Sequence, residues 1–188
     1  NAGMSPAEVS AIPIPDWKNL PQVHEMFQSR ERWVKAFPDD IPPFSNVSQL
    51  DVHAGEKKWF LGFPSFVDLG IFLLGTSDFL AELGMESELA EALLDKSFEL
   101  STSYLEFMHS VYPIQMELLL GFAGDTACLL SPSLYKKYSV RWDAMLFEYV
   151  QNRYGCAENF PCNLHSCGPS VHLYDAWGEH PHNDNIVV

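Results

Sequence analysis

The segment Asn163-Leu-His-Ser-Cys-Gly168 contains the side chains of this sequence that are best suited to chemistry. Residues two apart in an extended strand point to the same side, so His165 and Cys167 would present an imidazole and a thiolate together. Zinc prefers His and Cys ligands, and a catalytic zinc ion keeps one coordination position open for the reactant. The spacing therefore predicts half of a zinc site, with His165 and Cys167 as metal ligands.

The cysteines near this segment also allow a rival arrangement. Cys156 and Cys162 precede His165 and Cys167, and the four side chains could form a closed structural zinc cluster. The spacing between Cys156 and Cys162 is unusual for a zinc ribbon, which favours the two-ligand site. Because no export signal is present, we expect the cysteines, Cys128 included, to be reduced thiols or metal ligands.

Asp125 is a further candidate because it follows an apolar run. Residues 114–121 are almost entirely apolar, and Asp125 lies in the loop that comes next. Parallel α/β folds collect their reactive groups at the carboxyl ends of strands, so we expect Asp125 to be catalytic. The alternative is that its carboxylate only braces the loop before Ser131. No Gly-x-Ser-x-Gly, Gly-x-Gly-x-x-Gly or Walker A motif supports a serine hydrolase or a nucleotide site.

The elements that must position these residues alternate between strands and helices. Ser131 followed by Pro132 is a typical helix start, and Ser87 can cap a longer helix whose apolar residues fall on one side. The alternation predicts a parallel sheet covered by helices. The expected strands are 58–63, 114–121, 163–165 and a last one at Ile186, and the expected helices are 67–74, 87–110, 131–150 and a short one ending near Gly178.

The composition narrows the class of protein. The chain has 188 residues, of which 47% are hydrophobic, and 11 basic against 25 acidic residues give a formal charge of −14. This charge argues against nucleic acid and an anionic membrane as partners. No apolar run approaches the roughly 18–20 residues of a membrane helix, and no signal peptide is seen, so a cytoplasmic enzyme is expected. The abrupt ends of the sequence suggest a piece of a longer protein.

Several motifs occur in an order that resembles the uroporphyrinogen decarboxylase superfamily. They are Gly124-Asp125 after a buried strand, Leu130-Ser-Pro-Ser-Leu-Tyr135 at a helix start, and His165-Ser-Cys-Gly168 after the next strand. The similarity is to the methylcobamide:coenzyme M methyltransferase-like branch in particular. Upstream, the segments 62–70, 74–80 and 86–95 resemble the same family, so the resemblance covers residues 58–188.

The resemblance implies an α/β fold, a TIM-type (β/α)8 barrel of which this chain would hold about half. Residues 1–57 would be an irregular and helical lead-in, and residues 58–188 the barrel segment with about four of the eight strands. Half a barrel leaves strand edges uncovered, which predicts pairing with missing chain or with a second copy in a homo-oligomer.

In the methyltransferase branch, the residues that match His165 and Cys167 bind zinc together with a later cysteine that this sequence does not contain. The implied reaction is attack by a zinc-bound thiolate, from a small thiol substrate, on the methyl group of a methyl-corrinoid that is free or held by a corrinoid protein. Asp125 matches an acidic position that would orient the substrate or a proton. The alternatives are metal-free decarboxylation of uroporphyrinogen in porphyrin biosynthesis, and a non-catalytic fragment that binds a corrinoid protein or self-associates.

Overall fold

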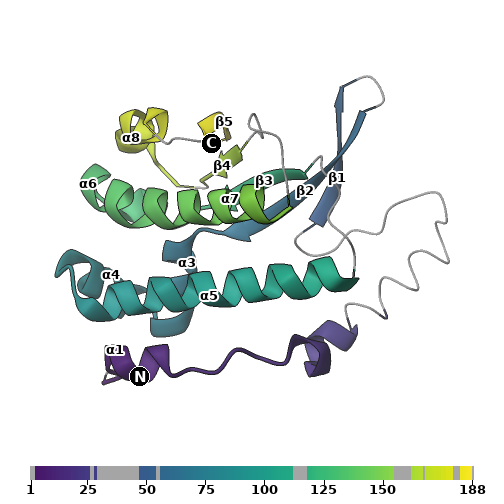
Figure 1. The fold of residues 1–188 in the computed structure, drawn as a ribbon. Helices are drawn as coiled ribbons and strands as arrows, with labels where there is room; N and C mark the ends of the chain where they lie inside the picture. Colours follow the sequence, from purple (N-terminus) through teal and green to yellow (C-terminus); the bar gives the residue numbers. More distant parts are fainter. Residues whose placement is uncertain are drawn as a thin grey trace.

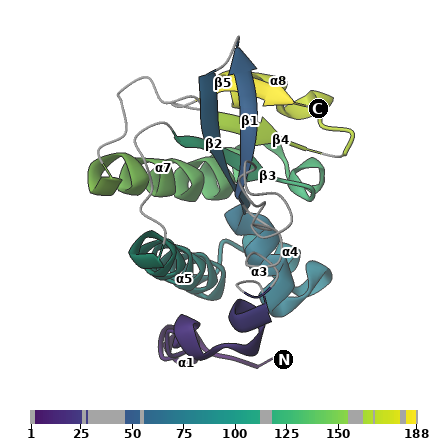
Figure 2. The same cartoon turned by 90° about the vertical axis from the view of Figure 1, so that its right-hand side faces the viewer.

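A computed structural model shows a stack of helices with a sheet at one end. It describes residues 3–25, 28, 47–53, 56–111, 118–154, 162–166, 168–179 and 183–187. Helices α1 (Pro6–Ser10), α5 (Glu88–Val111) and α7 (Arg141–Tyr154) lie one above another, and α8 (Tyr174–Gly178) lies on the far side of α7 from α5 (Figures 1 and 2). The N-terminal segment is therefore remote from the sheet.

Five strands form one sheet in the order in which they occur along the chain. The first two pair antiparallel, and each later strand pairs parallel with its predecessor. Pro64 is opposite Ala123, and Ala123 is opposite His165, so the second, third and fourth strands end side by side. The strands are β1 (Val47–His53), β2 (Glu56–Pro64), β3 (Leu118–Ala123), β4 (Cys162–His165) and β5 (Asn183–Val187).

Helices connect the parallel strands. After β2 come α3 (Phe66–Leu74), α4 (Thr76–Gly84) and α5. After β3, a short turn leads into α6 (Pro132–Leu134), which continues through a π-helical turn into α7 without a break. The remaining short elements are η1 (Trp17–Asn19), η2 (Ala127–Leu129), the π-helical turn η3 (Tyr135–Val140) and η4 (Val171–Leu173).

Serine side chains cap four of the helix starts, and two of them are the starts that the sequence predicts. The Ala90 amide donates to Oγ of Ser87 at 3.1 Å, and the Leu134 amide donates to Oγ of Ser131 at 3.3 Å. A capping hydroxyl satisfies an amide that has no carbonyl partner within the helix, which is worth about 1 kcal/mol. The other two caps are Ser5 at the start of α1 and Ser65 at the start of α3, and Ser65 belongs to the site described below.

The helix after Ser131 has an aromatic stripe that is part of the core. Tyr138 and Trp142 are fully buried, and their rings stack with centroids 6.1 Å apart. The indole Nε1 of Trp142 donates to Oδ1 of Asp95 on α5 at 3.1 Å, so the buried ring keeps its polar atom satisfied. The stripe therefore packs this helix against α3 and α5.

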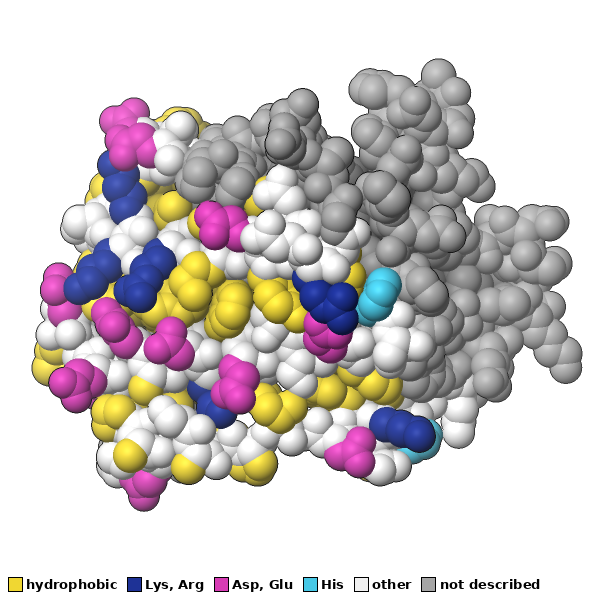
Figure 3. Space-filling model, in the orientation of Figure 1, with side chains coloured by type: hydrophobic (Ala, Val, Ile, Leu, Met, Phe, Trp, Pro, Cys, Tyr) yellow, Lys and Arg dark blue, Asp and Glu magenta, His cyan; other side chains and the backbone are white. Residues whose placement is uncertain are grey.

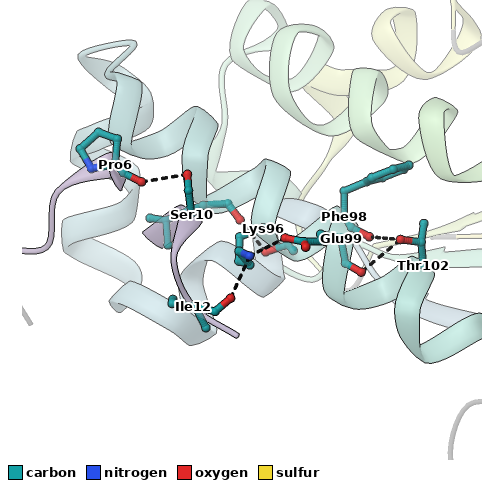
Figure 4. A network of polar contacts seen from close by, with 9 residues as sticks. Pro6, Ser10, Ile12, Lys96, Phe98, Glu99 and Thr102 are labelled. Atoms are coloured by element: carbon teal, nitrogen blue, oxygen red, sulfur yellow. Dashed lines mark hydrogen bonds and ion pairs between the residues drawn. The ribbon is translucent and has the colours of Figure 1, made fainter. Parts of the chain in front are cut away.

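A buried lysine attaches the N-terminal segment to α5. The side chain of Lys96 is 4% exposed, its Nζ donates to the carbonyl oxygen of Ile12 at 2.9 Å, and it is paired with Glu99 (Figure 4). The indole of Trp17 donates to Oγ of Ser103 at 2.8 Å and forms a second link. A buried charge is costly without partners, so these contacts fix where the segment lies.

Basic side chains on the helical face are paired with acidic ones from other elements. Arg153 on α7 donates to both carboxylate oxygens of Glu106 on α5, at 2.6 and 3.0 Å. Lys137 donates to Glu86 at 2.7 Å. Figure 3 shows basic and acidic side chains interleaved on this face. Exposed pairs of this kind contribute roughly 0–1 kcal/mol each, so they add little to the stability that the core provides.

The prediction of a TIM-type (β/α)8 barrel, present as about half a barrel, is wrong. The described chain is mainly helical, and the edge of β2 is occupied by the antiparallel strand β1. A (β/α)8 barrel requires two parallel neighbours for every strand, with a common tilt and stagger. No pairing joins β1 to β5 within the described sheet, which stays open. Within the same described residues, no helix combines the length and apolar character needed to cross a membrane.

Gly70 on α3 permits close packing of α3 against α4, and we expect Gly70→Ala to be destabilising. A Cβ at this position would overlap the ring of Phe79, with Cε2 only 2.7 Å away, and Phe79 is fully buried. Overpacking of this kind costs about 1–3 kcal/mol. Urea unfolding followed by circular dichroism measures the loss. Gly84→Ala is the matched control because nothing lies within 4 Å of its added Cβ; equal midpoints for the two variants would contradict the packing shown.

Candidate functional site

The ends of three parallel strands surround a small cavity with both polar and apolar walls. Ser65, Gly124 and Ser166 are the first residues after β2, β3 and β4 respectively. The cavity has a volume of about 10 Å³, the space that one water molecule requires. Its lining residues are Ser65, Gly124, Ala127, Tyr135, Ser139, Asp143, His165, Ser166 and Trp177. Ligand sites of parallel sheets lie at this edge, so the cavity is the candidate functional site.

The carboxylate of Asp68 holds the loop after β3 against the start of α3. Its oxygens accept hydrogen bonds from the amides of Asp125 and Thr126, at 3.0 and 3.1 Å, and from the Thr126 hydroxyl. The Ser65 hydroxyl donates to the same carboxylate at 3.2 Å. Burial raises the pKa of Asp68, while the hydrogen bonds from Thr126, Ser65 and Asp125 act in the opposite direction.

Asp143 on α7 is a second buried carboxyl group, and it borders the cavity. It is 1% exposed, and the Ser139 hydroxyl donates to its Oδ2 at 2.9 Å. Burial raises the pKa of Asp143 to about 8; the Ser139 hydrogen bond and the nearby Phe66 amide oppose the rise, and the negative charge of Asp68 adds to it. At neutral pH, Asp143 is therefore largely a neutral acid that can donate a proton.

The π-helical turn η3 places side chains in the wall of this cavity. Such a turn adds one residue to a helical repeat and changes which side chains face inward, and it occurs frequently at functional sites. Here Tyr135 and Ser139 of η3 line the same cavity as Asp143 of α7. The turn thus brings a hydroxyl group and a carboxyl group of one helix to the strand ends.

His165 is the last residue of β4, in agreement with the strand predicted there. Its side chain is exposed and borders the cavity, and its carbonyl oxygen accepts a hydrogen bond from the Gly124 amide at 2.7 Å. The hydroxyl groups of Ser166 and Ser170 are 2.7 Å apart and buried. The main chain of His165 is therefore fixed, while its imidazole reaches the surface.

Asp125 lies in the loop that Asp68 holds. Its side chain is exposed, and its amide donates to Asp68. It is not among the described residues that line the cavity. Among the described contacts, the main-chain amide of Asp125, rather than its carboxylate, holds this loop in place. The catalytic role of Asp125 stays a prediction.

The predicted partner of His165 cannot be placed, because Cys167 lies outside the described residues, as do Cys156 and the side chain of Cys162. Cys128 does reach this segment: a Cβ on Gly168 would overlap its Sγ and lie 2.6 Å from its Cβ. Cys128 is a free, partly exposed thiol. It therefore packs against the loop that follows β4.

Three residues of this region were missed as site residues in the sequence. Asp68 follows Ser65 by three residues, which is the usual distance between an N-cap serine and an acidic residue in the first turn of a helix. Asp143 directly follows Trp142 and interrupts an apolar helix face, which marks a buried acid. Cys128 has no comparable signal, because its contact with Gly168 arises from the packing of two loops.

The donor chemistry of the site fits a zinc ion only in part. His165 supplies one exposed imidazole at the strand ends, and imidazole is a preferred zinc ligand. Among the described side chains, no group of three His, Cys, Asp or Glu residues is arranged to hold a metal ion. A complete site would need further donors in addition to His165, and Cys167 is the one that the sequence predicts.

Comparisons with known proteins add no assignment. No family model matches the chain, and no curated protein and no solved structure matches it either. What the site does must therefore be inferred from its residues and their surroundings.

The raised pKa of Asp143 predicts a stability that falls as the pH rises. The unfolded chain releases this proton near a pKa of about 3.9, whereas the folded protein retains it up to about 8. Between these values the unfolded state binds fewer protons, so the free energy of unfolding decreases by about 1 kcal/mol per pH unit. Asp143→Asn cannot titrate and should remove this contribution to the slope.

Urea unfolding at several pH values between about 5.5 and 7.5 measures the slope. Asp78→Asn is the control because it makes the same substitution at an exposed aspartate, on α4. The assignment of Asp143 as a buried neutral acid would be wrong if Asp143→Asn and Asp78→Asn showed the same pH dependence as the wild type.

Proposed function

We propose that this chain catalyses zinc-dependent transfer of a methyl group from a methyl-corrinoid to a small thiol, at the strand ends of β2 to β4. The observation that carries the proposal is the position of His165. Its imidazole is exposed at the end of β4, and its main chain is held by the Gly124 amide. A metal ligand on a backbone that is already held by a hydrogen bond is preorganised for binding.

The proposed ligands are His165 and Cys167, the pair that the spacing of the sequence predicts. When bound, the zinc would act as a Lewis acid that lowers the pKa of a thiol substrate. Asp68 would hold the loop after β3 in place through the amides of Asp125 and Thr126. That contact leaves the exposed carboxylate of Asp125 beside the strand ends, where it would orient the substrate.

Reduced thiols are needed for both the ligand and the substrate, so we place the protein in the cytoplasm. The methyl-corrinoid would approach from solvent, free or on a corrinoid protein, because the cavity of about 10 Å³ has room for no more than a water molecule. The reaction would therefore take place on the exposed side of His165. The buried acids Asp68 and Asp143 would lie beneath this surface and support the site.

One observation favours a second function, the metal-free decarboxylation of uroporphyrinogen. Loss of carbon dioxide leaves an electron pair on carbon that must take up a proton, and Asp143 is a buried acid that retains its proton at neutral pH. Uroporphyrinogen would also have to bind on the exposed side. Release of carbon dioxide from uroporphyrinogen by the purified protein, lost in Asp143→Leu, would favour this function over methyl transfer.

Zinc content tests the methyl-transfer proposal. We expect the full chain, purified in the presence of zinc, to contain bound metal by mass spectrometry, and His165→Ala to lose most of it because one of the ligands is removed. His24→Ala is the matched control, since His24 is exposed in the N-terminal segment. The rate of thiol methylation with a methyl-corrinoid as donor should likewise be lost in His165→Ala and retained in His24→Ala.

Two results would count against the proposal. Equal zinc content in His165→Ala and in the wild type would remove His165 from the metal site. No zinc and no carbon dioxide release from any variant would leave the non-catalytic alternative, a chain that binds a corrinoid protein or another copy of itself.

A further inference from the structure

An apolar pocket lies between α3, α5 and η1, and none of its described lining residues borders the cavity at the strand ends. Its volume is about 300 Å³, which is in the range of small-molecule sites in proteins. The lining residues are Trp17, Pro64, Leu69, Phe72, Leu73, Ser97, Leu100, Ser101 and Tyr104. This pocket is a second candidate site, and it does not depend on the proposed methyl transfer.

Two helices supply most of the pocket wall. Leu69, Phe72 and Leu73 are three and four residues apart on α3, and so share one face of that helix. The wall from α5 has the same spacing over residues 97–104. Such stripes usually pack directly against each other, because protein interiors contain few voids larger than a water molecule. A space of this size between two stripes therefore favours a ligand.

The N-terminal segment completes the wall. Trp17 of η1 lines the pocket, and its Nε1 donates to Oγ of Ser103 at 2.8 Å. Its ring meets the ring of Tyr104 edge to face, with centroids 5.3 Å apart. Lys96 fixes the same segment to α5 through the carbonyl oxygen of Ile12 (Figure 4). The pocket is therefore already formed without a ligand.

Serine hydroxyls are the polar part of the α5 wall. Ser97 is 2% exposed, and its Oγ donates to the carbonyl oxygen of Leu93 at 2.8 Å, which leaves its lone pairs available as acceptors. Ser101, one turn further along, is 8% exposed, and its hydroxyl has no hydrogen-bond partner among the described residues. An unpaired hydroxyl in an apolar wall is costly, so Ser101 favours a ligand that carries a hydrogen-bonding group.

The lining also limits the charge and the size of the ligand. No charged side chain is among the described residues of the wall, and burial raises the pKa of Tyr104, which keeps its hydroxyl neutral. An ionised group would be costly there, because no opposite charge would compensate it. A cavity of about 150 Å³ can hold one benzene molecule, so a pocket of about 300 Å³ has room for roughly two fused rings.

We propose that this pocket binds a small, uncharged aromatic molecule of about two fused rings that carries one hydroxyl group. The ligand hydroxyl would accept a hydrogen bond from Ser101 and donate one to Ser97. Its rings would lie between the stripes of α3 and α5 and would cover Phe72, which is 76% exposed at the rim of the pocket.

Calorimetric titration of the full chain tests the class of ligand with 2-naphthol, 2-naphthoate and naphthalene near neutral pH. These probes share their rings; the first carries a hydroxyl group, the second a negative charge and the third neither. We expect 2-naphthol to form a one-to-one complex and 2-naphthoate to bind at least about 10-fold more weakly, because its charge has no partner. No binding of 2-naphthol up to about 1 mM, or equal affinities for 2-naphthol and 2-naphthoate, would overturn the proposal.

Ser101→Ala tests the hydrogen bond. Loss of one neutral hydrogen bond lowers affinity by roughly 2–10-fold. We expect this loss for 2-naphthol and no change for naphthalene, which cannot form the bond. Ser110→Ala is the matched control, because Ser110 is an exposed serine of α5 outside the pocket. Equal affinity for 2-naphthol in the two variants would contradict the role of Ser101.

Phe72→Ala tests the position of the ligand, and the exposure of Phe72 makes a loss of folding an unexpected result. The variant removes apolar surface that the ligand should cover, so both 2-naphthol and naphthalene should bind at least about 5-fold more weakly. Met85→Ala is the matched control, since Met85 is 66% exposed and does not line the pocket. Equal affinities in these two variants would overturn the proposal.

Two further measurements separate this site from the rest of the protein. The urea midpoint of each variant reports on folding independently of binding. Zinc content should be the same in Ser101→Ala, Phe72→Ala and the wild type, because the pocket shares no described residue with the strand ends. Failure of 2-naphthol to bind would therefore refute the pocket alone, and absence of zinc would refute the methyl-transfer proposal alone.

Discussion

The hydrogen bonds to the buried carboxylate of Asp68 are the constraint on which the candidate site depends. This one side chain receives donors from the start of α3 and from the loop after β3, and so fixes two strand ends relative to each other. Without an acceptor there, the amides of Asp125 and Thr126 would be left without this partner. A charged group is well suited to this task, because hydrogen bonds to a carboxylate are stronger than those between neutral groups.

The presence of Asp143 close to Asp68 has an energetic cost and a chemical consequence. Two carboxylates in a poorly solvated region cannot both ionise easily, and the better-bonded one takes the charge. Asp68 has several donors, whereas Asp143 has only the Ser139 hydroxyl and the nearby Phe66 amide among the described residues. The pair thus divides into a structural anion and a neutral acid, and the neutral acid borders the cavity at the strand ends.

The remainder of the chain provides a rigid support for these groups. The stacked helices bury the aromatic stripe of Tyr138 and Trp142, and Lys96 secures the N-terminal segment on the opposite side of α5. Helix α7 therefore cannot shift easily relative to α3, and the distance between Asp143 and the start of α3 is maintained. A site that relies on a buried acid needs this rigidity, because small displacements would admit water and change the pKa.

The sequence by itself determined the local elements: the serine caps at Ser87 and Ser131, the helix that follows Ser131, and a strand that ends at His165. These depend on hydrogen bonds and apolar spacing within one segment. The tertiary structure alone decided how the strands pair, including the antiparallel edge that excludes a barrel, and how Asp68, Asp143 and Cys128 reach the ends of strands far away in the sequence. The physical reason is that pairing, burial and pKa depend on contacts between distant segments, which no local pattern specifies.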